Sequence, residues 1–199
     1  MIRKGKIFRK EKAMEFPEFY ISELKKTLEA LNLDRIKEIS EVLIRANGEE
    51  KTIFICGMGG SASTASHFAN DLSKMTISPG RKRFRVIALT DNVSLITAWT
   101  NDRGSEMCFV EPLKNLFHEG DVLIAISGSG NSASVLNAVR YVNAHKGTTI
   151  GLTGFSGGGL GEIAHISIVV KSDNMQRIED GHLILSHLIS SFICDLLKG

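Results

Sequence analysis

The sequence predicts an α/β protein in which a doubly wound, five-stranded parallel sheet lies between two layers of helices. The run Val122–Ile126 lacks the alternation of half-exposed strands, a pattern typical of a strand buried on both faces, and four further short apolar segments indicate the other strands. Segments with apolar residues at helical spacing separate these runs, as in sheets whose strands are joined by crossover helices. The length of 199 residues suits one domain with a sizeable core.

The composition is that of a globular protein, with 43% hydrophobic and 23% charged residues. The net charge of +2 is too small to indicate a nucleic-acid partner. No apolar run approaches the ~20 residues needed to cross a bilayer, and the N-terminus lacks the apolar stretch of a signal peptide. We therefore expect a cytoplasmic protein with no membrane partner. The scattered cysteines, Cys56, Cys108 and Cys194, are expected to be reduced.

The N-terminal part of the chain divides into a basic tail and two helices. Residues 1–12 are rich in Lys and Arg and poor in apolar residues, which predicts a flexible tail ahead of a single domain over residues 13–199. Apolar residues at helical spacing predict helices over residues 16–31 and 33–46, together forming a helical hairpin. Two helices ahead of the first strand are more than a small sheet needs, so we expect them to pack against another copy of the chain.

The first strand-and-helix unit covers residues 52–74, and a turn of Gly and Ser joins its two parts. The second strand is expected over 84–89, and the helix that follows it is expected to break at 101–104. Cations crowd residues 81–85, which fits a solvated surface or, alternatively, recognition of a strongly anionic ligand. A further helix over 111–117 leads to the central strand.

The central strand, residues 122–126, ends in the turn Ser127-Gly-Ser-Gly-Asn-Ser132 ahead of a helix. This geometry points backbone N–H groups and a helix N-terminus at an anion, and the hydroxyls of Ser127, Ser129 and Ser132 can add donors. No lysine of a nucleotide-binding loop follows, which favours a phosphate monoester over a nucleoside triphosphate. The alternative is an ordinary turn in which Asn131 or Ser132 caps the helix.

Two more strands, 148–152 and 166–170, flank a glycine-rich segment at 154–159 that is expected to form a flexible loop. One long helix over 175–197 closes the chain. Ligands of parallel sheets bind outside the carboxyl ends of the strands. We therefore expect three segments to meet at one edge of the sheet: the serine turn (residues 127–132), the glycine turn at 57–63 and the glycine-rich loop at 154–159.

Four ordered motifs carry a resemblance to a known family. They are Gly57-Met-Gly-Gly-Ser-Ala with His67, Ala88-Leu-Thr-Asp leading to Asn101-Asp102, the stretch from Gly120 to Ser132, and Arg177-Ile-Glu-Asp-Gly-His182 with His187. Through them the chain after its tail resembles the SIS (sugar isomerase) family and, within it, the phosphoheptose isomerases. The resemblance implies a flavodoxin-like fold, a homotetramer with sites shared between subunits, and a phosphorylated sugar as partner.

The resemblance also implies which residues form the site. Phosphate would be held by Ser127, Gly128, Ser129 and Ser132, and the sugar hydroxyls would meet Met58, Gly59, Gly60, Ser61, Asn101 and Asp102. A divalent metal, expected to be zinc, would be held by His67, Asp71, Glu179 and His187. The implied reaction converts sedoheptulose 7-phosphate to D-glycero-D-manno-heptose 7-phosphate through an enediol. Asp71 would act as the base, with Glu179 as its alternative, and His187 as the acid.

The spacing of two of these residues suits a metal. His67 and Asp71 are four residues apart and so share one face of a helix. Imidazole and carboxylate are both donors to zinc. Without the resemblance, His67 and Asp71 would be interpreted as a surface pair, and His187 as a core histidine.

Three positions depart from the family pattern. Asp71 stands where the family usually has Glu, Glu179 where it has Gln, and Met58 where it commonly has Asn. Misplacing a reacting group by about 1 Å can cost about 10²-fold in rate. The departures therefore leave two alternatives open. One is a non-catalytic regulator that binds a phosphosugar or a protein such as the replication initiator, and the other is an isomerase for a different sugar.

Overall fold

The computed structural model describes residues 15–198, so the predicted basic tail at 1–12 lies outside the described residues. The helices are α2 (Phe16–Glu29), α3 (Leu33–Gly48), α4 (Gly60–Lys74), α5 (Val93–Arg103), the 3-10 turn η1 (Ser105–Met107), α6 (Val110–Leu116), α7 (Ala133–Ala144), α8 (Gly158–Ile163) and α9 (Met175–Lys198). The strands are β1 (Thr52–Gly57), β2 (Arg85–Ala88), β3 (Val122–Ser127), β4 (Thr148–Gly154) and β5 (Ile166–Val170).

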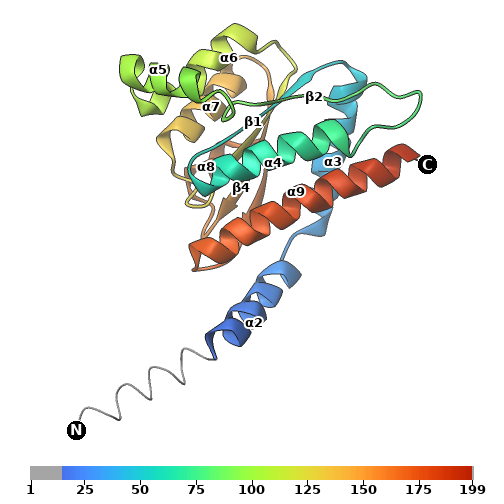
Figure 1. Ribbon diagram of the computed structural model, residues 1–199, viewed down its shortest axis with the longest axis vertical. Helices are drawn as coiled ribbons and strands as arrows, with labels where there is room; N and C mark the ends of the chain where they lie inside the picture. Colours follow the sequence, from blue (N-terminus) through green and yellow to red (C-terminus); the bar gives the residue numbers. More distant parts are fainter. Residues whose placement is uncertain (1–14, 199) are drawn as a thin grey trace.

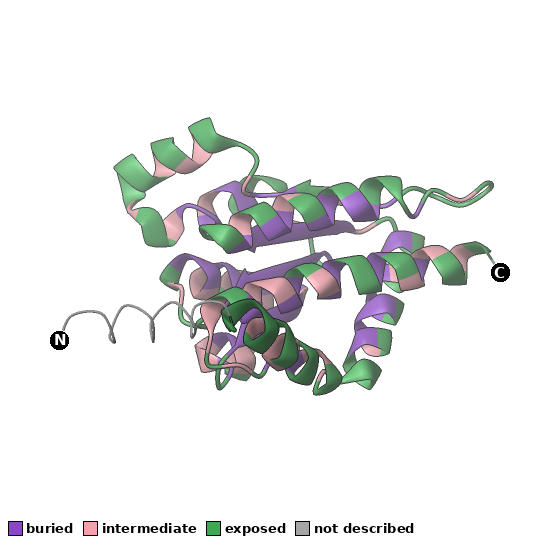
Figure 2. Cartoon of the chain, turned by 60° about the horizontal axis from the view of Figure 1, so that its bottom comes forward, coloured by how far each residue is buried: buried purple, intermediate pink, exposed green. Residues whose placement is uncertain are grey.

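The five strands form one parallel sheet in the order β2-β1-β3-β4-β5 (Figure 1). Helices α3, α4 and α9 cover one face, and α6, α7 and α8 cover the other. This is the predicted three-layer arrangement with the flavodoxin-like strand order, in which the chain reverses direction across the sheet between β1 and β3. The strands β1 and β3 are buried throughout and β4 at all but its first residue, the edge strand β2 is largely exposed, and the helices expose their outer sides (Figure 2).

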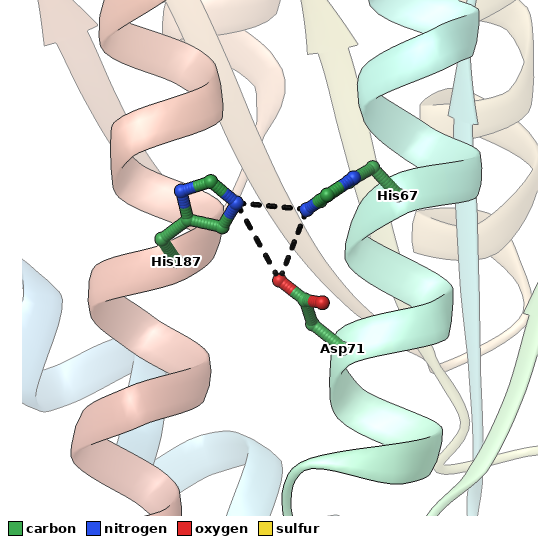
Figure 3. A group of neighbouring side chains, drawn as sticks. All are labelled: His67, Asp71 and His187. Carbon is green, nitrogen blue, oxygen red and sulfur yellow. Dashed lines mark hydrogen bonds and ion pairs between the residues drawn. The ribbon is translucent and has the colours of Figure 1, made fainter.

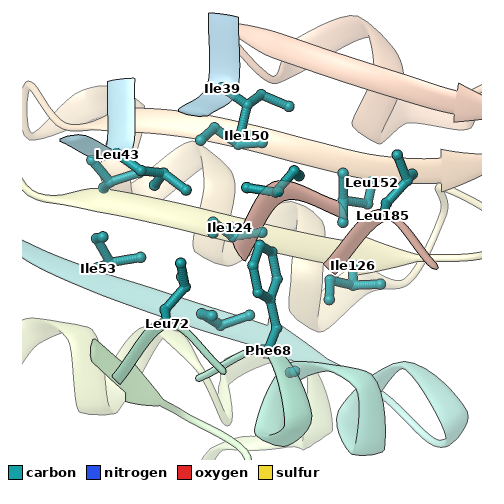
Figure 4. Close-up of a cluster of buried hydrophobic side chains, with 14 of the residues drawn as sticks. Ile39, Leu43, Ile53, Phe68, Leu72, Ile124, Ile126, Ile150, Leu152 and Leu185 are labelled. Atoms are coloured by element: carbon teal, nitrogen blue, oxygen red, sulfur yellow. The ribbon is translucent and has the colours of Figure 1, made fainter. Parts of the chain in front are cut away.

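The core on the α4 and α9 side fixes these two helices against the sheet. Phe68 and Leu72 of α4 pack with Ile124 of β3 and Leu185 of α9 in one cluster (Figure 4). Each of these side chains is fully buried, and each such burial stabilises the fold by about 1.5–3 kcal/mol. Side chains on the outer faces of α4 and α9 are therefore held at a defined separation.

The N-terminal helices differ from the predicted hairpin. Instead of lying along α3, α2 packs mainly against α9, where the hydroxyl of Tyr20 donates to the Asp180 carboxylate. The apolar side chains of Phe16, Phe19 and Ile21 remain exposed on α2 (Figure 2 colours this helix mostly green). Packing within residues 15–198 therefore leaves these apolar side chains of α2 exposed to solvent.

Several element boundaries also differ from the expected ones. Helix α5 includes Asn101, Asp102 and Arg103 and ends at Gly104, the last residue of the predicted break at 101–104, where a φ of +92° favours glycine. The glycine-rich segment is not a flexible loop throughout, because α8 starts at Gly158. Strand β2 is shorter than predicted and covers Arg85–Ala88.

Helix α9 is long and apolar enough, by length and composition alone, to cross a membrane. Of its most apolar window, 44% is buried inside the protein, on the side of α9 that faces the sheet. Ile178, Leu185, Ile189 and Ile193 are fully buried against the sheet and its neighbours. The hydrophobicity of α9 therefore reflects packing in the domain.

Candidate active site

A pocket of about 270 Å³ opens where β1 and β3 end, at the point where the sheet changes direction. Its lining comes from three segments: Met58, Gly59, Gly60 and Ser61 after β1; Ile126, Ser127, Gly128, Ser129 and Ser132 at the end of β3; and Met175 and Glu179 of α9. The structure thus brings eight of the predicted substrate-binding residues into one place. We call this cavity the serine pocket.

The first turn of the serine pocket depends on glycine. A Cβ atom at Gly57 would lie 2.5 Å from the carbonyl oxygen of Ser61, so only glycine allows α4 to begin so close to β1. Gly59 has a φ of +59° and occupies the N-cap position of α4 without a side-chain cap. The N-terminal end of α4 is therefore left open to a ligand.

The second turn is not an ordinary helix cap. Ser132 occupies the N-cap position of α7, but its hydroxyl makes no capping hydrogen bond and instead meets the Ser134 hydroxyl at 3.1 Å. The alternative of Asn131 or Ser132 as a simple cap is therefore wrong. The first N–H groups of α7 and the serine hydroxyls remain available to an anion.

Charge in the serine pocket is unusual for a phosphate site. Among residues 15–198, the lining includes one charged side chain, Glu179, and no cation. An anion here would be held by neutral hydroxyls, backbone N–H groups and the positive ends of the α4 and α7 dipoles.

A second cluster lies further along the same two helices. His67 and Asp71 are one turn apart on α4 and face His187 of α9 (Figure 3). The two Nε2 atoms are 2.7 Å apart, and Asp71 Oδ2 lies 3.4 Å from that of His67 and 3.8 Å from that of His187. Neighbouring ligands of a tetrahedral zinc ion are about 3.3 Å apart for bonds of about 2.0 Å. The three donors, which we call the His–Asp cluster, have the spacing of ligands to one ion.

The environment of Asp71 also suits a cation. Its Oδ2 atom is buried and has no hydrogen-bond partner within the described part of the chain. The side chains of His67 and His187 are 44% and 48% exposed, so the cluster is open on the imidazole side. An unpaired buried acceptor costs about 1–3 kcal/mol. A divalent metal would satisfy this oxygen, and the residues fit such an ion.

Glu179 does not join the His–Asp cluster. Its carboxylate lies against the start of α4, where a Cβ atom on Gly60 would be 2.5 Å from Glu179 Oε1. Asn101 and Asp102 are exposed at the end of α5 and do not line the serine pocket. Within this chain, the predicted site is therefore divided between the serine pocket, the His–Asp cluster and the end of α5.

Two pocket residues were not predicted as site residues from the sequence: Ile126, the last apolar residue of the central strand, and Met175. Met175, at the start of α9, faces Gly128, and a Cβ atom at Gly128 would overlap the Met175 sulfur. A methionine carries no chemical signal of its own. In the sequence, the signal for a bulky side chain opposite the serine turn is the glycine at position 128, which leaves room for it.

His182, which belongs to the last of the four motifs, is a core residue. It is buried, and its Nε2 donates to the carbonyl oxygen of Thr153 at 3.1 Å. Burial lowers the pKa of His182 to about 4, against a smaller opposing effect of this hydrogen bond. The imidazole is neutral near pH 7, and its hydrogen bond to Thr153 ties α9 to the end of β4.

The strand order and the serine pocket define this molecule as a flavodoxin-like α/β protein with an open, anion-compatible site at the switch point of its sheet. A family model described as SIS domain matches residues 19–154. The chain belongs to the SIS domain family.

Individual relatives agree with this assignment. A phosphoheptose isomerase of Geotalea uraniireducens is 36% identical over 167 residues, which are 82% of this chain and 84% of that protein. A phosphoheptose isomerase of Helicobacter pylori is 36% identical over 175 residues, 88% of each chain. The structure of phosphoheptose isomerase GmhA from Neisseria gonorrhoeae superimposes with a TM-score of 0.82 at 30% identity, covering 94% of this chain and 98% of that one.

Proposed function

We propose that this protein is a phosphosugar isomerase that converts sedoheptulose 7-phosphate to D-glycero-D-manno-heptose 7-phosphate. The names of the relatives support the reaction class, and one structural observation supports the substrate. The serine pocket and the His–Asp cluster lie at two positions along the helix pair α4 and α9. At the pocket, Gly60 of α4 contacts Glu179 of α9. Seven residues further along α4, His67 contacts His187. This offset is about 10 Å at 1.5 Å per residue, comparable to an extended seven-carbon sugar phosphate.

In this proposal the phosphate is held by the serine pocket and the C1–C2 end lies at the His–Asp cluster. Asp71 removes a proton from C1 of the ketose, and an enediol forms across C1 and C2. Returning that proton to C2 gives the aldose, while the hydroxyl proton moves from O1 to O2 with His187 as the acid. Binding energy from the remote phosphate positions the reacting carbons.

A divalent metal, which we propose to be zinc, would be held by His67, Asp71 and His187, and would polarise the carbonyl and stabilise negative charge on its oxygen. Glu179 is the predicted fourth ligand and the alternative base. Its present position against Gly60 requires the side chain to turn along α9 for either role.

We also propose a homotetramer, in which Asn101 and Asp102 reach the sugar in a neighbouring subunit. The exposed apolar residues of α2, Phe16, Phe19 and Ile21, support a second copy as the cover of this helix. Such an enzyme is expected in the cytoplasm, with no membrane or nucleic-acid partner.

The reaction can be tested by mixing purified protein with sedoheptulose 7-phosphate and following the aldoheptose, with and without a chelator and with zinc restored. We expect aldose to form and activity to return with the metal. Binding of the sugar phosphate without any aldose, over a range of metals and pH, would instead support a non-catalytic regulator.

A further inference from the structure

The segment that follows β4 packs against the serine turn and is hydrogen-bonded to it. The Leu160 N–H donates to the Gly130 carbonyl at 2.9 Å. The Thr153 hydroxyl donates to the Gly157 carbonyl at 2.9 Å, which fixes the same segment to the buried end of β4. Gly130 has a φ of +68°, and any side chain there would overlap Gly157. The close approach of the two segments therefore depends on glycine at position 130.

Asn131 is the one side chain of the serine turn that bonds to both segments, as far as residues 15–198 show. Its Oδ1 accepts the Gly159 N–H at 3.0 Å, and its Nδ2 donates to the Ser129 carbonyl at 3.0 Å. The side chain is exposed and contributes no core packing. Its amide therefore serves the shape of the turn rather than the stability of the core.

The backbone of Asn131 also orients a proposed phosphate donor. Its N–H donates to the Ser129 Oγ at 3.2 Å. Because this oxygen already accepts a hydrogen bond, the hydroxyl proton of Ser129 is directed away and can be donated to a ligand. Donors fixed before the ligand arrives bind it with less ordering cost.

We propose that Asn131 is a positioning residue, which holds Ser129 and the neighbouring N–H groups in the conformation that binds the phosphate of the substrate. This inference rests on the proposed function, because it assigns the phosphate to the serine turn. It predicts that loss of the Asn131 amide weakens phosphate binding and leaves the proton transfers at the distant His–Asp cluster intact.

The test compares Asn131→Ala and Asn131→Asp with the wild type, using KM and kcat for sedoheptulose 7-phosphate and the direct binding constant of inorganic phosphate from phosphorus NMR. For Asn131→Ala we expect KM and the phosphate dissociation constant each to rise about tenfold, with kcat within about twofold and an unchanged melting temperature. Asn131→Asp keeps the acceptor for Gly159 but loses the donor to Ser129 and adds a negative charge, so a larger rise is expected.

Asn137→Ala is the matched control. Its amide also donates to a backbone carbonyl, that of Glu106 at 3.2 Å, but from helix α7, which follows the serine turn, and away from the turn itself. Its KM and phosphate affinity should equal those of the wild type. The inference is overturned if Asn131→Ala leaves both constants unchanged, or lowers kcat alone. Failure of the wild type to isomerise, with phosphate binding still weakened in Asn131→Ala, would refute the proposed reaction and not the role of Asn131.

Discussion

Replacing Asp71 with Asn should make the metal-free protein more stable while removing its activity. Asp71 is almost entirely buried, and its Oδ2 atom has no hydrogen-bond partner in the described structure. Leaving that acceptor unpaired costs about 1–3 kcal/mol. An Asn side chain carries no charge, and its amide can donate to a neutral imidazole. The expected gain of about 1–3 kcal/mol corresponds to a rise of about 2–10 °C in Tm for a domain of this size.

The assay is thermal unfolding with a chelator at pH 8, beside isomerase assays with zinc. Asp195→Asn is a suitable control, since Asp195 is exposed on the last turns of α9 and should change stability by no more than about 0.5 kcal/mol. A lower Tm for Asp71→Asn, or full turnover, would refute the reasoning that Asp71 is kept at a cost to stability for chemistry.

Three further predictions follow from the same contacts. His187→Ala should abolish turnover and leave the circular dichroism spectrum unchanged, because the side chain is half exposed; normal turnover would remove its role as acid. Gly128→Ala should displace the flexible Met175 side chain toward the serine pocket and raise KM by up to about tenfold, and adding Met175→Ala to that variant should partly restore KM. An unaltered KM in Gly128→Ala would separate the serine turn from the substrate. The hydrogen bond to Asp180, with burial, raises the pKa of Tyr20 to about 12. The stability from this contact is therefore fully present below pH 10, the ordinary tyrosine pKa, and is lost as pH rises through about 12. In alkaline unfolding experiments, Tyr20→Phe should reduce this loss of stability. An absorbance titration in which Tyr20 ionises near pH 10 would contradict the prediction.

The sheet could be predicted because its strands leave a local signal. The strands β1 and β3 are continuous apolar runs, and the structure buries every residue of both. The end of α5 is predicted less sharply: residues 101–104 together indicate a break, yet Asn101 and Asp102 are still helical and the helix ends at Gly104. Both residues are tolerated near a helix end, and the backbone stops only at Gly104, where φ is positive.

The site shows the same division between local and distant information. The i, i+4 spacing of His67 and Asp71 predicted a shared face, and the structure places both facing His187. The place of Glu179 depends on how far α9 lies along α4, which packing between distant segments decides. No periodicity in the sequence contains that offset, and the structure puts the Glu179 carboxylate beside Gly60, outside the His–Asp cluster.

The most direct measurement is a structure of the protein with bound sedoheptulose 7-phosphate, assembled with any neighbouring subunits. The account predicts the phosphorus atom within hydrogen-bonding reach of Ser127, Ser129 and Ser132, and carbons C1 and C2 beside Asp71 and His187. A sugar whose phosphate avoids the serine pocket, or whose C1–C2 end points away from the His–Asp cluster, would contradict it.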